Sequence, residues 1–314
     1  MAVLDDYQRV ALSLGGWGSL DDVEVVAFDE HFADEDALVA AVAGFEVVVA
    51  MRERTALPVS VIERLPRLRL IVTTGMRNVV IDVAAANRAG VVVMGTYGVI
   101  TPTSELTWGL IFAVLRDIPA ADASVRGGGW QLSLGTGLAG RTLGIVGLGN
   151  LGAMVAAVGL ALKMRVVAWS QNLTPERAAD VGVALATKEE LFATADVVTI
   201  HLVLSDRTRG LVGEPELRSM KPTSVLINTS RGPIVDEAVL VRALAEGWIK
   251  GAGIDVYGTE PLPADHPLRR SPRCVLTPHI GYVTDDNYAV FFRHIVEDIA
   301  AFQRGEELRV VTPG

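Results

Sequence analysis

The sequence predicts an α/β protein with two doubly wound parallel-sheet domains. Short apolar runs typical of buried strands alternate with helical patterns along almost the whole chain, the order expected when helices cover both faces of a parallel sheet. A glycine-rich turn with G-x-G-x-x-G spacing lies near the middle of the chain, and a complete series of α/β units precedes it. We therefore expect one domain to be inserted into the other.

Composition limits the class of protein. The chain has 314 residues, 50% of them hydrophobic and 21% charged, which is ordinary for a globular protein with room for two cores. A net charge of −9 without a long Lys/Arg run argues against a nucleic-acid partner. Cys274 is the only cysteine, so no disulfide framework is expected, and no close His or acidic ligand pattern predicts a metal site. Without a signal-peptide pattern or a membrane-length apolar run, we expect a cytoplasmic protein with no membrane partner.

The chain before residue 120 carries a full set of strand and helix patterns. Apolar runs between polar turns predict the strands, and apolar residues at helical spacing predict the helices. Strands are expected at Val23–Phe28, Val47–Met51, Leu70–Thr73 and Val91–Met94. Helices are expected at Asp34–Ala43, Ser60–Arg64, Asp82–Arg88 and Ser104–Leu115.

The same alternation continues to the end of the chain. Arg126–Gly140 is rich in glycine and is expected to form a loop. Helices are expected at Ala153–Leu162 and at Asp286–Phe302. Strands are expected at Leu143–Gly147, Arg165–Ser170, Val183–Ala186, Asp196–His201, Ser224–Asn228, Gly253–Tyr257 and Cys274–Thr277.

The order of these elements predicts the domain boundaries. A dinucleotide-binding domain is expected over residues 99–282, and a substrate domain over residues 1–98 plus 283–314. The last helix is expected to cross back to the first part of the chain. Two crossings between domains make a hinge, and the cleft between the domains is the expected place for a substrate.

The glycine turn predicts a dinucleotide site of the Rossmann type. A strand precedes it, a helix follows it, and unpaired N–H groups at the start of that helix attract a pyrophosphate. Gly147 permits the turn, Gly149 lets the pyrophosphate approach, and Gly152 lets helix and strand pack closely. Asn150 and Leu151 complete the turn and belong to the same predicted site.

The second strand of this domain ends without the usual acidic residue. Asp or Glu at this place accepts hydrogen bonds from the ribose hydroxyls of NAD, whereas this chain has Ser170 followed by Gln171. A serine does not repel the 2′-phosphate of NADP, yet no Arg or Lys directly follows to bind it. We expect NAD(H), with NADP(H) as an open alternative. His201, at the end of the fourth strand, either lines the cofactor pocket or has a structural role.

Three loops after later strands carry the groups needed for hydride transfer to a 2-keto acid. Arg231 follows the fifth strand, Asp255 lies in the carboxyl-terminal part of the sixth, Glu260 comes after it, and His279 follows the seventh. The carboxyl ends of parallel strands form the edge at which such sheets bind ligands. A guanidinium holds the substrate carboxylate and polarises the carbonyl, and an imidazole supplies a proton to the forming alkoxide. A carboxylate beside the imidazole stabilises the protonated ring.

The blocks Gly-Leu-Gly-Asn-Leu-Gly, Asn-Thr-Ser-Arg-Gly-Pro-Ile-Val-Asp, Asp-Val-Tyr-Gly-Thr-Glu-Pro-Leu and Leu-Thr-Pro-His-Ile-Gly resemble those of the D-specific 2-hydroxyacid dehydrogenases. That resemblance implies a Rossmann domain inserted into a flavodoxin-like substrate domain, and an oxidoreductase acting on the CH–OH group of small D-2-hydroxy acids. Candidate substrates are 3-phosphoglycerate, glyoxylate and hydroxypyruvate. It also implies that Arg231 binds the substrate carboxylate, that His279 donates or accepts the proton, and that Glu260 is its partner.

The resemblance also assigns binding residues. Asp255 would hold the nicotinamide carboxamide, and Thr229, Ser230 and Gly281 would border the cofactor. The loop Thr74, Gly75 and Met76 would bind the substrate carboxylate through its N–H groups. From the residues alone, Arg52, with Arg54 and Arg77 nearby, is a candidate for a second anion such as phosphate; a surface charge or a pair with Glu53 is the alternative.

Several alternatives remain at this stage. Some members of the family are dinucleotide-sensing co-repressors that bind partners instead of turning over metabolites. Formate oxidation is disfavoured because Glu260 stands where relatives with that activity have Gln, and an adenosylhomocysteine hydrolase needs a longer substrate domain. The resemblance further implies a homodimer paired through Ser104–Leu115 and the loop Gly127–Trp130. Finally, Lys163 stands where relatives have Gly, at a cost of roughly 1 kcal/mol if the backbone is left-handed there.

Overall fold

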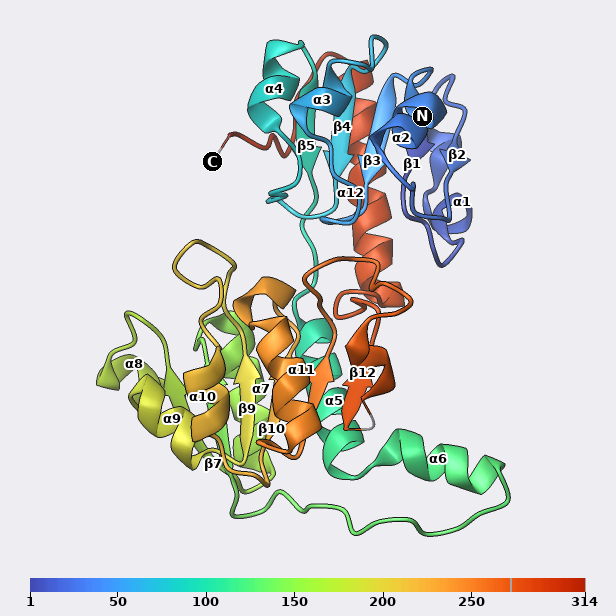
Figure 1. Cartoon of the computed structure of the whole chain (residues 1–314). Helices are drawn as coiled ribbons and strands as arrows, with labels where there is room; N and C mark the ends of the chain where they lie inside the picture. The colour runs from blue at the N-terminus through green and yellow to red at the C-terminus, as the bar shows by residue number, and fades with distance from the viewer. Residues whose placement is uncertain (272, 314) are drawn as a thin grey trace. The chain divides into compact units, whose positions relative to one another are not determined.

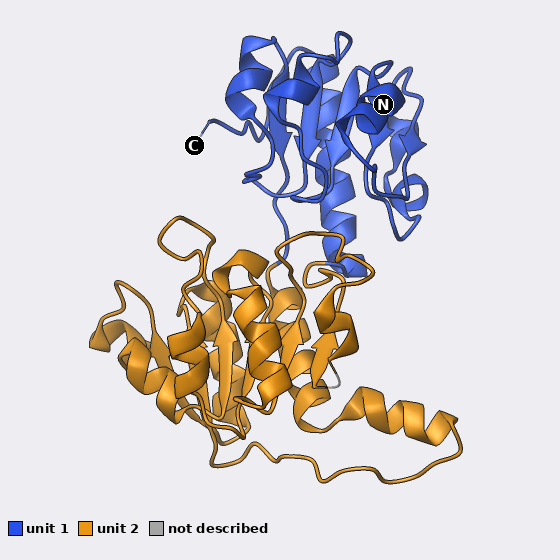
Figure 2. Ribbon diagram, viewed as in Figure 1, with its two compact units in different colours: residues 1–99, 283–314 blue, residues 100–282 orange. Residues whose placement is uncertain are grey.

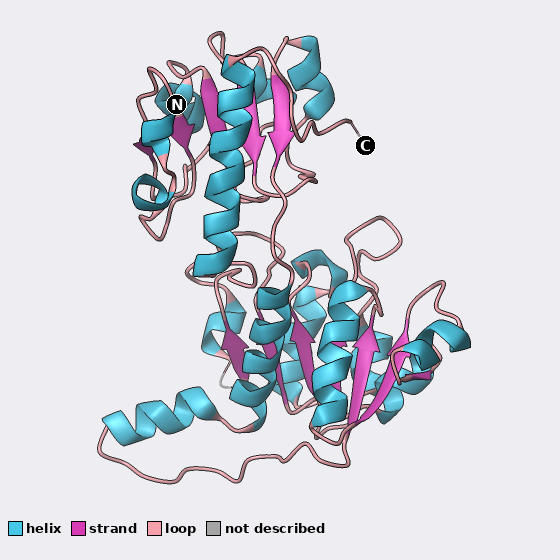
Figure 3. Ribbon diagram, turned by 180° about the vertical axis from the view of Figure 1, so that it is seen from behind, coloured by secondary structure: helices cyan, strands magenta, loops and turns pink. Residues whose placement is uncertain are grey.

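The computed structural model describes residues 1–271 and 273–313, which form two compact units. Unit 1 contains Met1–Val99 and the chain from Val283 onward, and unit 2 contains Ile100–Tyr282 (Figure 2). Each unit is a parallel sheet with helices packed against it (Figure 3). The predicted fold class, two parallel-sheet α/β domains, is confirmed.

Unit 1 has a five-stranded sheet in the order β2-β1-β3-β4-β5, which is the flavodoxin-like order (Figure 1). Strand β1, which lies between β2 and β3, was not predicted, because it is only two residues long and its apolar stretch is too short to show a pattern. The C-terminal segment adds a single antiparallel bridge from Val310 to Met94. The strands are β1 Ala2–Val3, β2 Val26–Ala27, β3 Val47–Ala50, β4 Leu70–Thr73 and β5 Val92–Gly95.

The helices of unit 1 bury apolar faces against this sheet. The long C-terminal helix α12 contacts α1 and β4, and its buried Phe291, Ile295 and Ile299 repeat every four residues. Side chains of Asp34 and Asp82 cap α2 and α4. The helices are α1 Ala11–Leu14, η1 Trp17–Ser19, α2 Glu35–Val42, α3 Val59–Ile62, α4 Val83–Arg88 and α12 Asp285–Gln303.

Unit 2 has a seven-stranded parallel sheet in the order β12-β11-β10-β9-β6-β7-β8, the Rossmann arrangement with one further strand. Strand β11 begins and ends earlier than the predicted Gly253–Tyr257, because Gly251 and Gly253 lie inside it, where α5 packs closely. A Cβ at Gly253 would lie 3.0 Å from Leu110 of α5. The strands are β6 Thr142–Val146, β7 Arg165–Trp169, β8 Ala184–Leu185, β9 Val197–Ile200, β10 Val225–Asn228, β11 Gly251–Ile254 and β12 Cys274–Leu276.

Two apolar cores lie on the two faces of the unit 2 sheet. One joins the sheet to α5, α7 and α8, and the other joins it to α9, α10 and α11. The carboxyl ends of the strands are therefore the free edge at which loops can gather side chains. The helices are α5 Thr101–Leu115, α6 Ile118–Arg126, α7 Asn150–Ala161, α8 Pro175–Asp180, α9 Lys188–Thr194, α10 Glu214–Ser219, η2 Gly232–Ile234, α11 Glu237–Glu246 and η3 Pro267–Arg270.

Helix α6 was not predicted. It is nine residues long and has only two large apolar side chains, Ile118 and Val125, which are too few to show a repeating helical pattern. Figures 1 and 3 show α6 and the segment that follows it projecting away from the sheet of unit 2. The predicted loop Arg126–Gly140 starts at the last residue of this helix.

Across residues 1–271 and 273–313, no helix is both long and apolar enough to cross a membrane. The same residues contain no group of three or more His, Cys, Asp or Glu side chains that could hold a metal ion.

Candidate active site

The turn between β6 and α7 forms a cradle in which two of the three glycines leave no room for a side chain. Gly147 has a φ of 106°, and a Cβ there would lie 2.4 Å from the carbonyl oxygen of His201. A Cβ at Gly152 would lie 2.2 Å from the carbonyl oxygen of Gly147. At Gly149, the N-cap of α7, the Cβ position is open space. Because α7 lacks a side-chain cap, its first N–H groups can bind a pyrophosphate, and the turn fits NAD(H).

Ser170, at the end of β7, contacts the glycine turn itself. Its hydroxyl oxygen accepts a hydrogen bond from the N–H of Leu148 at 2.8 Å. The hydroxyl hydrogen stays available for a further acceptor. A cavity of about 590 Å³ adjoins Ser170 and is also lined by Gln171 and Lys188. Ser170 thus orders the turn, a role that the sequence did not suggest.

His201 follows β9 and is a neutral side chain. Burial lowers the pKa of its imidazole to about 3. Its Nε2 shares a hydrogen bond of 2.9 Å with the Thr199 hydroxyl, while Nδ1 has no hydrogen-bond partner in the part of the chain that the structure describes. The ring therefore offers a neutral polar atom and no charge at this edge.

The loop after β10 holds Arg231 through a network of backbone contacts. The Asn228 side chain accepts from the N–H of Ser230 at 3.0 Å and donates to the carbonyl of Arg231 at 3.0 Å. The hydroxyl of Ser230 donates to Ile200, and the hydroxyl of Thr229 bonds that of Thr107 at 2.9 Å. The side chains of Thr229 and Ser230 therefore order the loop, which leaves the backbone to border a cofactor.

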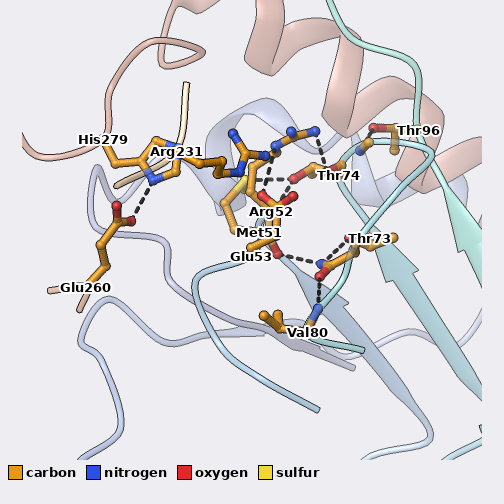
Figure 4. Close-up of polar contacts among 12 residues, drawn as sticks. Met51, Arg52, Glu53, Thr73, Thr74, Val80, Thr96, Arg231, Glu260 and His279 are labelled. Atoms are coloured by element: carbon orange, nitrogen blue, oxygen red, sulfur yellow. Dashed lines mark hydrogen bonds and ion pairs between the residues drawn. The ribbon is translucent and has the colours of Figure 1, made fainter. Parts of the chain in front are cut away.

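His279 and Glu260 form the central pair of the site. Nδ1 of His279 lies 2.6 Å from Oε2 of Glu260, and Figure 4 shows the ring and the carboxylate facing each other. Facing an ionised carboxylate, Nδ1 carries a hydrogen and donates it, which directs Nε2 away from Glu260. The other carboxylate oxygen of Glu260 accepts from the N–H of Tyr257 at 2.9 Å. The peptide bond between Glu260 and Pro261 is cis.

Asp255 organises the loop that carries His279. Its Oδ1 accepts from the hydroxyl of Thr277 at 2.6 Å and from the N–H of Ile280 at 2.8 Å, and its Oδ2 accepts from the N–H of Gly281 at 2.9 Å. Burial raises the pKa of this carboxyl, and these hydrogen bonds oppose that shift. Sequence reasoning missed Thr277, although its place at the end of a strand beside His279 was a usable signal.

Tyr257 connects the loop of Glu260 to the loop of His279. Its hydroxyl donates to the carbonyl oxygen of Thr277 at 2.9 Å. On its other side, the backbone of Tyr257 lies against Gly232, the residue after Arg231, where a Cβ would come within 2.1 Å of the Tyr257 carbonyl oxygen. The three loops after β10, β11 and β12 are thereby joined into one structure.

Unit 1 carries a separate polar edge, formed by the loops after β3 and β4. Arg52, with a φ of 54°, donates its backbone N–H to the Thr74 hydroxyl at 2.8 Å, and its guanidinium donates to the Thr74 carbonyl at 3.2 Å (Figure 4). Gly75 has a φ of 103°, and a Cβ there would lie 2.1 Å from the Arg52 guanidinium. Nε of Arg52 lies 3.8 Å from Glu53. The structure thus brings together Arg52, Thr74 and Gly75.

The backbone N–H groups of the loop after β4 are not equally available to bind an anion. The N–H of Thr74 donates to the carbonyl of Ala50 at 3.0 Å, and that of Gly75 donates to the Thr96 hydroxyl at 3.1 Å. Within residues 1–271 and 273–313, the N–H groups of Met76 and Arg77 have no acceptor. An anion at this loop would therefore meet the amides of Met76 and Arg77 first.

The fold and the chemistry of unit 2 define a nicotinamide-dependent oxidoreductase, since a dinucleotide cradle shares a sheet edge with a guanidinium and an imidazole–carboxylate pair. Comparison with known proteins agrees. Residues 108–281 match the model of the D-isomer specific 2-hydroxyacid dehydrogenase, NAD binding domain. A glyoxylate reductase of Aeropyrum pernix is 40% identical over 77% of this chain and 75% of that protein.

Two further relatives extend the comparison. A D-3-phosphoglycerate dehydrogenase of Mycobacterium tuberculosis is 37% identical over 84% of this chain, which spans only 50% of that protein. The crystal structure of a phosphoglycerate oxidoreductase from Vibrio cholerae superposes with a TM-score of 0.93 at 36% identity, covering 97% of this chain and 98% of the other. The chain belongs to the D-isomer specific 2-hydroxyacid dehydrogenase family, and it is an NAD(H)-dependent enzyme of that family.

Proposed function

We propose that this enzyme reduces glyoxylate or hydroxypyruvate to the corresponding 2-hydroxy acid. The His279–Glu260 contact of 2.6 Å supports this proposal most directly, because it supplies a proton donor for the forming alkoxide. The similarity to glyoxylate reductases supports the choice of substrate. The overall reaction consumes NADH and one proton for each keto acid reduced, and bound NADH supplies the hydride.

The proposed roles of the residues follow from their chemistry. Arg231 binds the substrate carboxylate and polarises the carbonyl, and Nε2 of His279 donates the proton while Glu260 stabilises the charged ring. In unit 1, the amides of Met76 and Arg77 bind the carboxylate at the loop that Thr74, Gly75 and Arg52 build.

The cofactor is proposed to lie along the carboxyl edge of the unit 2 sheet. The pyrophosphate binds at the glycine turn, and the nicotinamide carboxamide binds near Asp255, which retains lone pairs beyond its loop contacts. The proposed contact residues are Gly147, Gly149, Asn150, Leu151, Gly152, Ser170, His201, Thr229, Ser230, Asp255 and Gly281.

A second candidate substrate is 3-phosphoglycerate. The crystallised Vibrio cholerae phosphoglycerate oxidoreductase supports it, and so do the guanidinium groups of Arg52, Arg54 and Arg77 near the carboxyl end of β3 and β4. Against it, Arg52 already donates to the Thr74 carbonyl and lies beside Glu53. If the phosphorylated acid is the substrate, Arg52→Ala raises its KM far more than that of glyoxylate.

A spectrophotometric panel tests the proposal. Glyoxylate, hydroxypyruvate, pyruvate and 3-phosphohydroxypyruvate are each assayed with NADH and with NADPH. The expected result is the highest kcat/KM for glyoxylate or hydroxypyruvate with NADH. A tenfold preference for NADPH would contradict the proposed use of NAD(H), and no oxidation of either cofactor with any acid would favour the co-repressor type of function instead.

We further propose a homodimer located in the cytoplasm. The exposed apolar side chains that follow α6, including Trp130 and Leu134, support pairing through that segment.

A further inference from the structure

Glu237, in the first turn of α11, binds the loop that carries Glu260. Its Oε2 accepts a hydrogen bond from the N–H of Gly258 at 3.2 Å. Gly258 lies between Tyr257 and Glu260 in the sequence. The N–H of Tyr257 donates to the Glu260 carboxylate at 2.9 Å, and this hydrogen bond closes the loop. Two carboxylates therefore hold the loop: that of Glu237, which belongs to α11, and that of Glu260, which belongs to the loop itself and contacts His279.

His266 holds Glu237 in place. Its Nε2 lies 3.0 Å from Oε1 of Glu237, and both side chains are partly buried, with 18% and 27% of their surface exposed. Its Nδ1 accepts from the N–H of Leu268 at 3.3 Å, where it caps η3. Because Nδ1 is an acceptor, the ring hydrogen is on Nε2 and is donated to Glu237. Both oxygens of Glu237 are thus engaged, one by His266 and one by Gly258.

The peptide between Tyr257 and Gly258 also borders the loop of Arg231. A Cβ at Gly232 would lie 2.0 Å from the carbonyl carbon of Tyr257 and 2.6 Å from the nitrogen of Gly258. A shift of this peptide would therefore disturb Glu260 on one side and the Arg231 loop on the other. A displacement of about 1 Å in such a group costs up to about 100-fold in rate.

We propose that Glu237 and His266 are positioning residues, which fix the Tyr257–Gly258 peptide and through it hold Glu260 against His279. This inference rests on the proposed function of the His279–Glu260 pair. Neither residue takes part in proton transfer. In the tautomer with hydrogen on Nε2, His266 donates to Glu237 and accepts from the N–H of Leu268, so both hydrogen bonds form with a neutral ring.

A double-mutant cycle tests whether Glu237 acts through Glu260. Glu237→Ala is expected to lower kcat/KM for the keto acid about tenfold and to move the alkaline limb of its pH profile to lower pH, because Glu260 then stabilises protonated His279 less well. In a Glu260→Gln background, the same change is expected to cost twofold or less. Glu237→Gln, whose amide oxygen still accepts from Gly258, should restore part of the activity.

His266→Asn gives a second variant in case Glu237→Ala folds poorly. The Asn oxygen can still cap η3 through the N–H of Leu268, but its shorter side chain does not reach Glu237. Asp196→Asn is the matched control. Asp196 also accepts a hydrogen bond from a backbone N–H, that of Thr142 at 2.8 Å, and it pairs with Lys221 at 3.0 Å. It lies at the amino ends of the strands, away from the carboxyl ends that carry the candidate site. The control is expected to lower the Tm and to leave kcat/KM and the pH profile unchanged.

Hydrogen–deuterium exchange gives a readout that is independent of turnover. The peptide containing Tyr257–Glu260 is expected to exchange faster in Glu237→Ala and His266→Asn, but not in Asp196→Asn. The inference is overturned if exchange in that peptide is unchanged, or if Glu237→Ala costs as much in the Glu260→Gln background as in the wild type. A wild type that reduces no keto acid overturns the proposed function, while the exchange result still decides whether Glu237 holds the loop.

Discussion

The His279 residue occupies a left-handed backbone conformation, with a φ of 54°. Such a conformation costs a non-glycine residue about 1–2 kcal/mol, so neighbouring contacts must hold it. Asp255 supplies them by accepting from the N–H groups of Ile280 and Gly281, directly after His279. A buried carboxylate is thus used to fix the direction in which the imidazole points.

Glu260→Gln is expected to narrow the pH range of keto-acid reduction. The protonated imidazole donates the proton, and a neutral amide stabilises that charge less than a carboxylate 2.6 Å away does. Activity should therefore be lost at lower pH: the alkaline limb of kcat/KM moves down by about 1 unit or more. Steady-state kinetics from pH 5 to 10 measure the limb, and Glu246→Gln, an exposed change on α11, serves as the control. An unmoved limb would contradict the pairing.

Lys163→Gly is expected to stabilise unit 2. Lys163 has a φ of 61°, as anticipated from the glycine found in relatives, and replacing it with glycine relieves about 1 kcal/mol of strain. Lys163→Ala keeps the same strain and is the matched control. Calorimetry should show a higher Tm for the glycine variant only. Equal Tm values for the two variants would mean that the backbone at this position carries no measurable strain.

At the scale of elements, the turn from β6 to α7 depends on close packing of helix and strand. Gly152→Ala places a methyl group 2.2 Å from the Gly147 carbonyl oxygen, so α7 must shift and its first N–H groups move away from the pyrophosphate. We expect the Kd for NADH, measured by fluorescence titration, to rise at least about tenfold.

Gly44→Ala is the control for this change, because a Cβ at Gly44 meets no atom within 4 Å. It should leave NADH binding as it is. Unchanged binding in Gly152→Ala would show that the turn is not the pyrophosphate site.

Much of this architecture could be predicted because strands in parallel sheets are buried on both faces and read as apolar runs. That signal placed β4 at its observed residues, Leu70–Thr73, and most other strands to within about two residues. It failed where its physical basis was absent. Strand β1 has only two residues. Strand β11 contains two glycines, which have no apolar side chain and allow α5 to pack closely. Helix α6 has no buried residue.

The candidate site was predictable in its residue types but not in its supporting contacts. Arg231, Glu260 and His279 follow strand ends, and that position is visible in the sequence. The contacts of Ser170 with Leu148 and of Glu237 with Gly258 join residues that are 22 and 21 positions apart. Such contacts depend on the register and packing of neighbouring elements, which no local pattern encodes.

At the scale of the whole molecule, the segment around α6 exposes more apolar surface than is usual for a protein that acts as a single chain. Leu134 is 95% exposed and Trp130 is 75% exposed, whereas soluble proteins rarely leave such large apolar side chains together in water. Helix α6 itself buries no residue. A second copy of the chain that covers this segment would remove the exposed apolar surface, which is the physical basis for the proposed homodimer.

The double variant Leu132→Asp/Leu134→Asp is expected to turn the proposed dimer into a monomer. Both side chains are exposed, at 65% and 95%, so the change costs little in the single chain but places two carboxylates in the proposed interface. Sedimentation velocity at micromolar concentration should show dimeric wild type and monomeric variant. Leu12→Asp, at a leucine in unit 1 that is 62% exposed, is the control and should remain dimeric. A monomeric wild type, or a variant that sediments as the wild type does, would leave the segment around α6 without a role in assembly.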